Sequence, residues 1–417
     1  MLAYGCQDTD SQAVAACRTL APAPRNRARR PPPPCHAAPV ALLSSTVRIA
    51  IDYRPALRTR TGVGYWVFHL ARALLAHGRL DLTLFTSSWK DRPLPDDVSR
   101  LEGARIVDRR LPVRVLNLLW HRVEWPSIER LAGEPFDVAY SPHPLLMPAR
   151  RAAQVVTIHD LDFLTNPERA GAEIRRDYPR LVRDHAWRAA HVIVISHYTA
   201  RQVERHLGLP PERMTVCYPG VPDWVSREGQ PIHRTAEHVL FVGTLERRKN
   251  IGTLLDAYAA LVARRPEAPP LVLAGRARPE AAPWLERIAR PPLAGRVRCL
   301  GYVSEEHRRH LFETAALFVM PSLEEGFGLP VVEAMGAGVP VVVSNRGALP
   351  EVVEQAGLVV EAEDAQALSG AMERMLADEA FRSAAVAQGL RRAARFRWDD
   401  TARSVLTAYE RALGRCT

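Results

Sequence analysis

The chain contains few cysteines, and their arrangement does not suggest a structural role. Its 417 residues include six, at positions 6, 17, 35, 217, 299 and 416, and three of these fall in the first 35 residues. Disulfide frameworks and zinc sites need cysteines at recurring short spacings, and no such pairing occurs. The sequence therefore argues against both and is typical of a protein from a reducing compartment.

Long apolar runs and the common nucleotide fingerprints are also missing. No apolar stretch reaches the roughly 18–20 residues that span a bilayer, and no Walker A sequence occurs. The loop Thr61–Tyr65 reads Thr-Gly-Val-Gly-Tyr, but Val67 stands where a dinucleotide fingerprint needs its third glycine. With 47% hydrophobic and 24% charged residues the composition is globular, and the length allows two or three domains.

Acidic residues are the scarcer charge. There are 46 of them against 56 Lys and Arg, which gives a formal net charge of +10. Such a balance favours binding to nucleic acid, anionic lipid or a phosphorylated substrate. A high-GC genome, whose proteins are rich in arginine, gives the same composition. The charge alone does not decide among these.

Residues 1–46 differ from the rest of the chain. They carry four arginines between positions 25 and 30, then Pro31–Pro34, and show no amphipathic period. We therefore expect a disordered N-terminal extension that takes no part in chemistry, with the fold beginning at Val47.

After Val47, short apolar runs alternate with helical patterns, which predicts parallel sheets with helices on both faces. Residues 222–236 interrupt this rhythm and read as a linker between two such units. The expected strands are Val47–Asp52, Leu82–Thr86, Ala104–Val107, Val138–Tyr140, Val155–Ile158, Val192–Ile195, Met214–Tyr218, His238–Val242, Leu271–Ala274, Val297–Leu300, Leu317–Met320, Val339–Val343 and Leu358–Val360. The expected helices include Val63–Ala76, Ile251–Arg265, Ser304–Thr314, Pro330–Ala337, Ala365–Leu376 and Phe396–Leu413.

The segment 322–335, Ser-Leu-Glu-Glu-Gly-Phe-Gly-Leu-Pro-Val-Val-Glu-Ala-Met, is the most informative part of the chain. Two carboxylates, Glu325 and Glu333, stand eight positions apart around a Gly-x-Gly turn that leads into a helix. Such a loop leaves backbone N–H groups at a helix N-terminus, where they can hold a phosphate or an electron-rich oxygen. One acid in the loop and one in the helix can then grip two parts of one ligand.

This Glu-x7-Glu spacing around Gly-Phe-Gly resembles the signature of retaining GT-B glycosyltransferases, above all family 4. The resemblance covers about residues 47–417. It implies an α/β GT-B fold, with two Rossmann-like, doubly wound parallel-sheet domains facing across a cleft. The implied divisions are a 47–224 acceptor domain, a 225–395 nucleotide-sugar domain, and a 396–417 helix that crosses back to the first domain. Within this family, the sequence most resembles bacterial mannosyl- and rhamnosyltransferases of polysaccharide assembly.

The resemblance also implies roles for single residues. Glu333 would bind the ribose, and Glu325 would lie at the donor sugar. Lys249, in Gly243-Thr-Leu-Glu-Arg-Arg-Lys-Asn250, matches the lysine that binds the diphosphate, and His159 matches a histidine that approaches the sugar. The other expected donor-binding residues lie at strand ends and glycine turns, and they are Gly62, Gly64, Thr244, Arg248, Gly275, Gly301, Tyr302, Gly326, Phe327, Gly328 and Leu329.

Two features depart from the family pattern or leave a choice open. Thr244 replaces the usual arginine, so either Arg247 or Arg248 substitutes for it, or Lys249 and the backbone hold the diphosphate alone. Asp160-Leu-Asp162 matches a metal motif of the other large glycosyltransferase fold. Three residues are a weak signal and GT-B enzymes need no such metal, so neither a metal nor a cofactor is expected.

Two further segments have alternative interpretations. His307-Arg-Arg-His310 is expected to be a solvated helix face. The basic, apolar stretch Leu111–Trp125 fits either a lipid surface or, more commonly, a helix that faces the core.

The predicted function is transfer of a hexose from a nucleotide diphosphate sugar, with GDP-mannose favoured, to a hydroxyl of a glycan or lipid-linked acceptor. We expect a cytoplasmic protein that does not bind nucleic acid, and leave open a peripheral contact at the inner face of the membrane. Two alternatives remain. A GT-B sugar-nucleotide epimerase would act without an acceptor, and a non-catalytic nucleic-acid-binding protein would gather its basic residues on one face.

Overall fold

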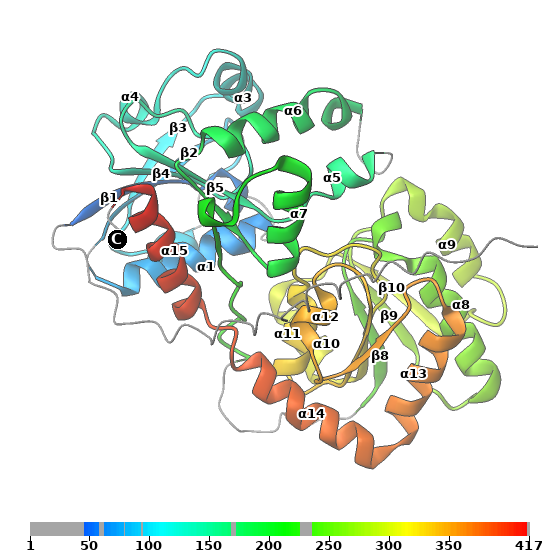
Figure 1. Cartoon of the computed structure of the whole chain (residues 1–417). Helices are drawn as coiled ribbons and strands as arrows, with labels where there is room; N and C mark the ends of the chain where they lie inside the picture. Colours follow the sequence, from blue (N-terminus) through cyan, green and yellow to red (C-terminus); the bar gives the residue numbers. More distant parts are fainter. Residues whose placement is uncertain are drawn as a thin grey trace, which may run out of the picture. The chain divides into compact units, whose positions relative to one another are not determined.

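The computed structural model describes residues 46–57, 62–78, 80–92, 95–167, 172–225 and 236–414. The predictions for residues 1–45 and for 226–235, the middle of the expected linker, lie outside these residues, as does Thr61. The structure has two parallel sheets, each with helices packed on it (Figure 1).

The first sheet has seven strands in the order β3-β2-β1-β4-β5-β6-β7, all parallel. The order reverses between β1 and β4, which is where ligands bind in doubly wound sheets. Its strands are β1 Val47–Asp52, β2 Leu80–Ser87, β3 Arg105–Arg109, β4 Val138–Ser141, β5 Ala153–Ile158, β6 His191–Val194 and β7 Met214–Val216.

The second sheet has six parallel strands in the order β10-β9-β8-β11-β12-β13, with its reversal between β8 and β11. Both sheets agree with the predicted pair of Rossmann-like folds. Its strands are β8 His238–Val242, β9 Leu271–Ala274, β10 Val297–Gly301, β11 Ala315–Met320, β12 Val341–Ser344 and β13 Leu358–Val360.

Local sequence explains where several helices begin. Ser196, Ser304 and Asp364 accept hydrogen bonds from backbone N–H groups of the first turn, as N-capping residues do. The α-helices are α1 Val63–Ala76, α2 Pro95–Arg100, α3 Val113–Arg122, α4 Ile128–Ala132, α5 Asp162–Thr165, α6 Ala172–Arg188, α7 His197–Leu207, α8 Ile251–Arg264, α9 Ala282–Ile288, α10 Glu305–Glu313, α11 Leu329–Gly336, α12 Leu349–Val353, α13 Ala365–Ala377, α14 Glu379–Ala393 and α15 Trp398–Ala412.

The last helix, α15, packs on the first sheet although α14, just before it, packs on α11 of the second (Figure 1). Trp398, at the start of α15, has its ring 5.8 Å from that of Trp66 and stacks at 5.2 Å on His69, both in α1. Further along, Tyr409 lies 5.7 Å from Tyr140 of β4. The helix therefore completes the core around a sheet whose strands lie much earlier in the sequence.

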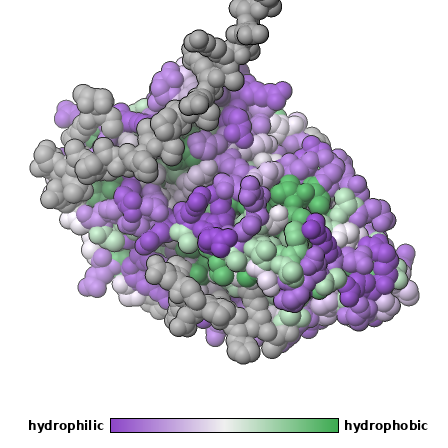
Figure 2. Space-filling view, turned by 60° about the horizontal axis from the view of Figure 1, so that its bottom comes forward, coloured by the Kyte–Doolittle hydropathy of each residue, from purple (hydrophilic) through white to green (hydrophobic). Residues whose placement is uncertain are grey.

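On the face shown in Figure 2, hydrophilic side chains surround smaller apolar areas. This mixture is ordinary, because the polar atoms of a folded protein are too few to cover its whole surface. Among the described residues, no helix is long and apolar enough to cross a membrane.

Candidate functional site

The candidate site forms where β8 and β11 end, at the reversal of the second sheet. β8 is followed by a 3-10 turn at Arg247–Lys249, and β11 by the loop that leads into α11. The two connections are joined because Leu323 donates its N–H to the carbonyl of Arg248 at 2.8 Å. Asn250 continues the turn in the left-handed region (φ 55°) and donates to the carbonyl of Pro321 at 3.1 Å.

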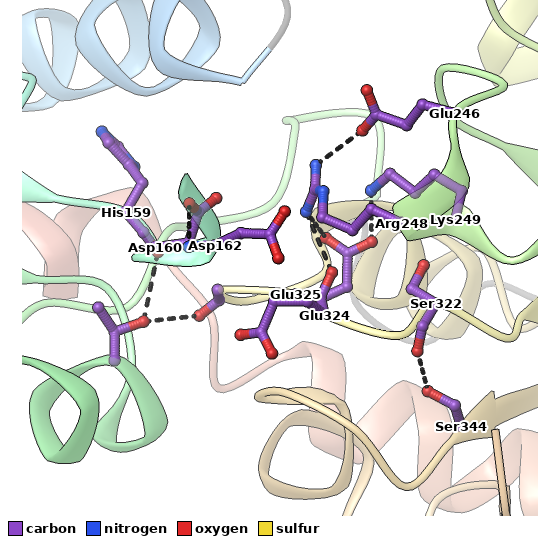
Figure 3. A network of polar contacts seen from close by, with 12 residues as sticks. His159, Asp160, Asp162, Glu246, Arg248, Lys249, Ser322, Glu324, Glu325 and Ser344 are labelled. Carbon is purple, nitrogen blue, oxygen red and sulfur yellow. Dashed lines mark hydrogen bonds and ion pairs between the residues drawn. The ribbon is translucent and has the colours of Figure 1, made fainter. Parts of the chain in front are cut away.

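Lys249 and Glu325 form a buried ion pair in this place (Figure 3). Arg248 also approaches the carboxylate, with its Nη1 3.4 Å from Oε2. Burial acts to raise the pKa of Glu325, but the charges of Lys249 and Arg248 outweigh it and hold that pKa below its ordinary value. Glu325 is therefore an anion fixed between two cations.

The use of lysine here stands out against the rest of the chain. Of the 56 basic residues, only Lys90 and Lys249 are lysines. A lysine ammonium carries three donors in a compact head, whereas an arginine presents a planar fork. Glu325 occupies one donor of Lys249, so a ligand oxygen could still accept from the others.

A second acidic group lies beside this pair. Glu324 accepts a hydrogen bond from the hydroxyl of Tyr198 at 2.8 Å, and Asp160 and Asp162 lie nearby (Figure 3). Burial, assisted by the two aspartates, raises the pKa of Glu324 to about 7. In the described part of the chain, no group of three acidic, histidine or cysteine side chains is arranged to hold a metal.

The glycine loop touches the first sheet directly. The carbonyl of Gly326 accepts from Ser196 Oγ at 2.7 Å and from Thr199 Oγ1 at 3.3 Å, and Thr199 also reaches the carbonyl of His159. A Cβ on Gly326 would overlap the carbonyl oxygen of His159, so this approach requires glycine.

A second contact joins the sheets at the N-terminus of α7. The carboxylate of Glu351, in α12, accepts from the backbone N–H groups of His197 and Tyr198, both at 2.8 Å. It also accepts from the hydroxyl of Tyr218 at 2.7 Å. An acid from the second domain thus caps a helix of the first.

Glu333 lies in α11, the helix that follows the loop of Glu325, and its side chain is buried, with the residue only 1% exposed. The nearest cation is Arg308 of α10, whose Nη2 lies 3.0 Å from Oε1. Neither carboxylate oxygen has a well-directed hydrogen bond among the described residues. Burial raises the pKa of Glu333, and Arg308 offsets part of that rise. A buried carboxylate with no well-directed hydrogen bond keeps acceptor capacity for ligand hydroxyls.

Arg308 corrects the prediction of a solvated face at 307–310. Its neighbours His307, Arg309 and His310 are exposed, but Arg308 turns inward and lies 5.7 Å from the ring of Tyr65 in α1. The sequence contained a signal for this inward direction. The apolar residues Leu311 and Phe312 stand three and four positions after Arg308, on the same side of the helix, and both are buried.

His159 is placed differently from the acidic group. Its Nε2 bonds the carbonyl of Pro142 at 2.8 Å, and its ring lies edge-on to Trp66 at 5.7 Å. Figure 3 shows the ring pointing away from Glu325. Burial lowers the pKa of His159, which favours the neutral ring.

The remaining predicted residues surround the strand ends. Gly275 packs so tightly on the carbonyl of Gly243 that no side chain fits there, and Tyr302 is exposed, with Arg276 5.0 Å above its ring. Phe327 points into the core against Tyr218 and Phe396, leaving only its backbone for a ligand.

Gly62 (φ 53°) precedes α1, and Gly64 packs on the carbonyl of Pro55. Both belong to the first domain, at the start of α1. Thr244 and Gly328 lie in the connections after β8 and β11, and Gly301 is the last residue of β10. Leu329 starts α11, one residue before the predicted Pro330.

Two parallel doubly wound sheets, with acids and cations gathered at the strand ends of the second, define the GT-B class of glycosyltransferase. Sucrose-phosphate synthase from Thermosynechococcus elongatus has the same fold, with a TM-score of 0.70 at 22% identity, over 89% of this chain and all of that one.

Two family models match, "Glycosyltransferase Family 4" over residues 60–223 and "Glycosyl transferases group 1" over residues 236–378. The O-antigen chain mannosyltransferase B of Escherichia coli is 33% identical over 66% of this chain and 74% of its own length. The serotype-specific mannosyltransferase WbdA of Escherichia coli is 30% identical over 62% of this chain but only 33% of its own length. The chain belongs to the family 4, group 1 glycosyltransferases.

Proposed function

We propose that this glycosyltransferase moves a mannosyl group, with retention of configuration, from a nucleotide diphosphate sugar to a hydroxyl of a glycan or lipid-linked acceptor. The observation that carries the proposal is the buried Lys249–Glu325 pair at the ends of β8 and β11. A fixed cation in a water-poor site is what departure of a diphosphate needs, because negative charge builds up on the leaving oxygen.

Each part of the donor would have its own partners. The buried carboxylate oxygens of Glu333, which have no well-directed hydrogen bond although Arg308 is close, would accept the two ribose hydroxyls. Lys249 would meet the diphosphate with the donors that Glu325 leaves unused, and Glu325, with the backbone around Gly326, would hold sugar hydroxyls. The exposed Arg276–Tyr302 pair offers a stacking surface for the base.

Retention is proposed from the resemblance of the Glu-x7-Glu segment to retaining enzymes, and the state of Glu325 bears on the route by which it would occur. Its carboxylate is bound by Lys249 and Arg248, so attack on the sugar would break a buried ion pair. We therefore propose front-face transfer, in which the departing phosphate oxygen takes the proton of the acceptor hydroxyl as the new glycosidic bond forms.

Mannose as the transferred sugar is supported by the two Escherichia coli relatives, both mannosyltransferases. GDP as its carrier is part of the proposal. Calorimetry with GDP and UDP tests the carrier, and we expect GDP to bind at least tenfold more tightly. NMR of the first product formed from GDP-mannose tests the stereochemistry, and an α-linked product is expected. Tighter binding of UDP would overturn the donor assignment, and a β-linked product would overturn retention.

A further inference from the structure

Helix α3 has two apolar sides, and only one of them faces the core. Leu116 and Trp120 are buried beneath it against Phe85 and its neighbours. On the opposite side Leu118 is 62% exposed, and just after the helix Val123 and Trp125 are 61% and 52% exposed. The sequence left a lipid surface and a core-facing helix as alternatives for 111–125, and the structure gives this segment a buried side and an exposed apolar one.

The exposed side chains are concentrated rather than scattered. Within the described residues, 13 large hydrophobic side chains are exposed, and six of them lie between positions 111 and 125. Single exposed apolar residues need no explanation, whereas a continuous group marks a contact surface. We name this surface the α3 face, and its members are Arg110, Leu111, Val113, Arg114, Val115, Leu118, Arg122, Val123 and Trp125.

Helical geometry places arginines among the apolar members. Within α3, positions 114, 115, 118 and 122 are related by intervals of three and four, so they share one side of the helix, and Leu111 lies just before its start. The three arginines of the face, Arg110, Arg114 and Arg122, are all exposed. Their aliphatic stems can lie along an apolar layer while the guanidinium groups reach anionic oxygens.

Acidic residues near the face are already engaged. Glu124 forms an ion pair with Arg188, Nη1 to Oε1 at 2.6 Å, and Glu129 accepts the backbone N–H of Arg150 at 2.8 Å. The α3 face is also tied to the end of β2, because Ser87 Oγ donates to the carbonyl of Leu111 at 3.0 Å. Trp89, two residues further on, is 71% exposed.

We propose that the α3 face is a docking surface for an anionic lipid bilayer. Apolar side chains would enter the boundary between headgroups and acyl chains, tryptophans would lie at the headgroup level, and the arginines would pair with lipid phosphates. Charge complementarity favours this occupant, because the face carries three arginines, and Glu124 beside it is paired with Arg188. Docking would hold the first sheet at the membrane, and it needs neither donor nor catalysis.

Flotation of the full chain with vesicles tests the proposal. We expect binding to vesicles of phosphatidylcholine mixed with phosphatidylglycerol, weaker binding to phosphatidylcholine alone, and partial release at high salt. Arg110→Gln/Arg114→Gln should lower the partition coefficient about 25-fold, since one surface arginine contributes about fivefold. Val115→Ser/Leu118→Ser should lower it at least about fivefold.

Matched changes on exposed residues of the second domain serve as controls. Arg290→Gln/Arg395→Gln and Leu285→Ser/Leu390→Ser remove the same charge or apolar surface elsewhere and should bind like the parent chain. Because all these positions are exposed, melting temperatures should stay unchanged and loss of binding would not reflect misfolding.

Three results would overturn the assignment. One is an absence of binding to the mixed vesicles. Another is binding that survives both α3 variants but disappears when Arg25, Arg27, Arg29 and Arg30 are replaced by serine. The third is a concentration-dependent dimer in sedimentation that Leu118→Ser dissolves, which would make a second copy of the chain the occupant.

Discussion

Lys249 has two roles, one in the stability of the fold and one that we propose in catalysis. It compensates the buried charge of Glu325, and we propose that it stabilises the leaving diphosphate. Removing one partner of a buried pair costs up to about 3–5 kcal/mol of folding free energy. Here Arg248 would still compensate part of the charge of Glu325. Catalytic loss must therefore be measured on a variant that remains folded.

We expect Lys249→Ala to lower kcat about 100-fold, or roughly 2.7 kcal/mol, with a smaller effect on the donor KM. Initial rates of nucleotide diphosphate release measure this. Adding Glu325→Gln should restore the melting temperature without restoring kcat. The exposed Arg247 is the matched control, and Arg247→Ala should stay close to the parent rate. Full activity in Lys249→Ala, or a strict need for added Mn²⁺, would contradict this role.

Glu324 makes stability depend on pH. Burial raises its pKa in the folded protein to about 7, above the ordinary glutamate value of 4.5. The folded state therefore binds the proton more tightly than the unfolded state does. The resulting stabilisation is complete below about pH 4.5 and is lost as pH rises through 7. Glu324→Gln keeps an oxygen for Tyr198 but carries no charge.

Relative to the parent chain, Glu324→Gln should melt about 2 °C or more higher at pH 8, with no difference near pH 4.5. Differential scanning calorimetry across this range checks the prediction. Glu354→Gln is the control, because Glu354 is exposed and pairs with Arg392 away from the acidic group. A difference that is constant with pH would mean that Glu324 does not titrate as proposed.

At the scale of elements, the contact of α12 with α7 determines how firmly the sheets hold together at the candidate site. Glu351 accepts two backbone N–H groups and one hydroxyl from the first domain. We expect Glu351→Ala to cost about 1–2 kcal/mol and to speed hydrogen exchange in the first turn of α7. Glu354→Ala, in the residue just after α12, should leave that exchange unchanged. Unchanged hydrogen exchange at the backbone N–H groups of His197 and Tyr198 in Glu351→Ala would show that Glu351 does not stabilise the start of α7.

The elements themselves could be predicted closely because apolar runs and helical periods are separated by clear turn residues. Strands β1, β8, β9 and β13 begin and end where the sequence predicts. The sequence also placed Lys249 and Glu325 in connections that follow strands, but it did not show that the two strands are neighbours in the sheet. It did not predict that they pair with each other.

Tertiary contacts account for what the sequence analysis missed. Arg308 looks like one more polar residue in a charged helix until Glu333 and Tyr65 are brought to it. The direction of the His159 ring depends on Pro142, which belongs to another loop. Tyr198 and Glu351 act across the two domains, and nothing local in their own segments indicates their partners.

At the scale of the whole molecule, α15 makes the first domain depend on the end of the chain. Trp398 is buried against Tyr65, Trp66 and His69. Trp398→Ala should cost about 3–5 kcal/mol by leaving a cavity, measured by denaturant unfolding. Thr407→Ala, at a half-buried position of the same helix where the hydroxyl donates to the carbonyl of Arg403, is the control. A loss below 1 kcal/mol would show that α15 is not needed to complete this core.

The route of α15 also affects how the protein is made. The last strand of the first sheet, β7, ends at Val216, but the helix that covers part of that sheet begins only at Trp398. During synthesis, the ribosome must therefore complete the entire second sheet before the first can be closed. Until then the surface of α1 that receives Trp398 is open to other chains and to chaperones. The nascent first domain should therefore be most prone to aggregation while the second domain is still being translated.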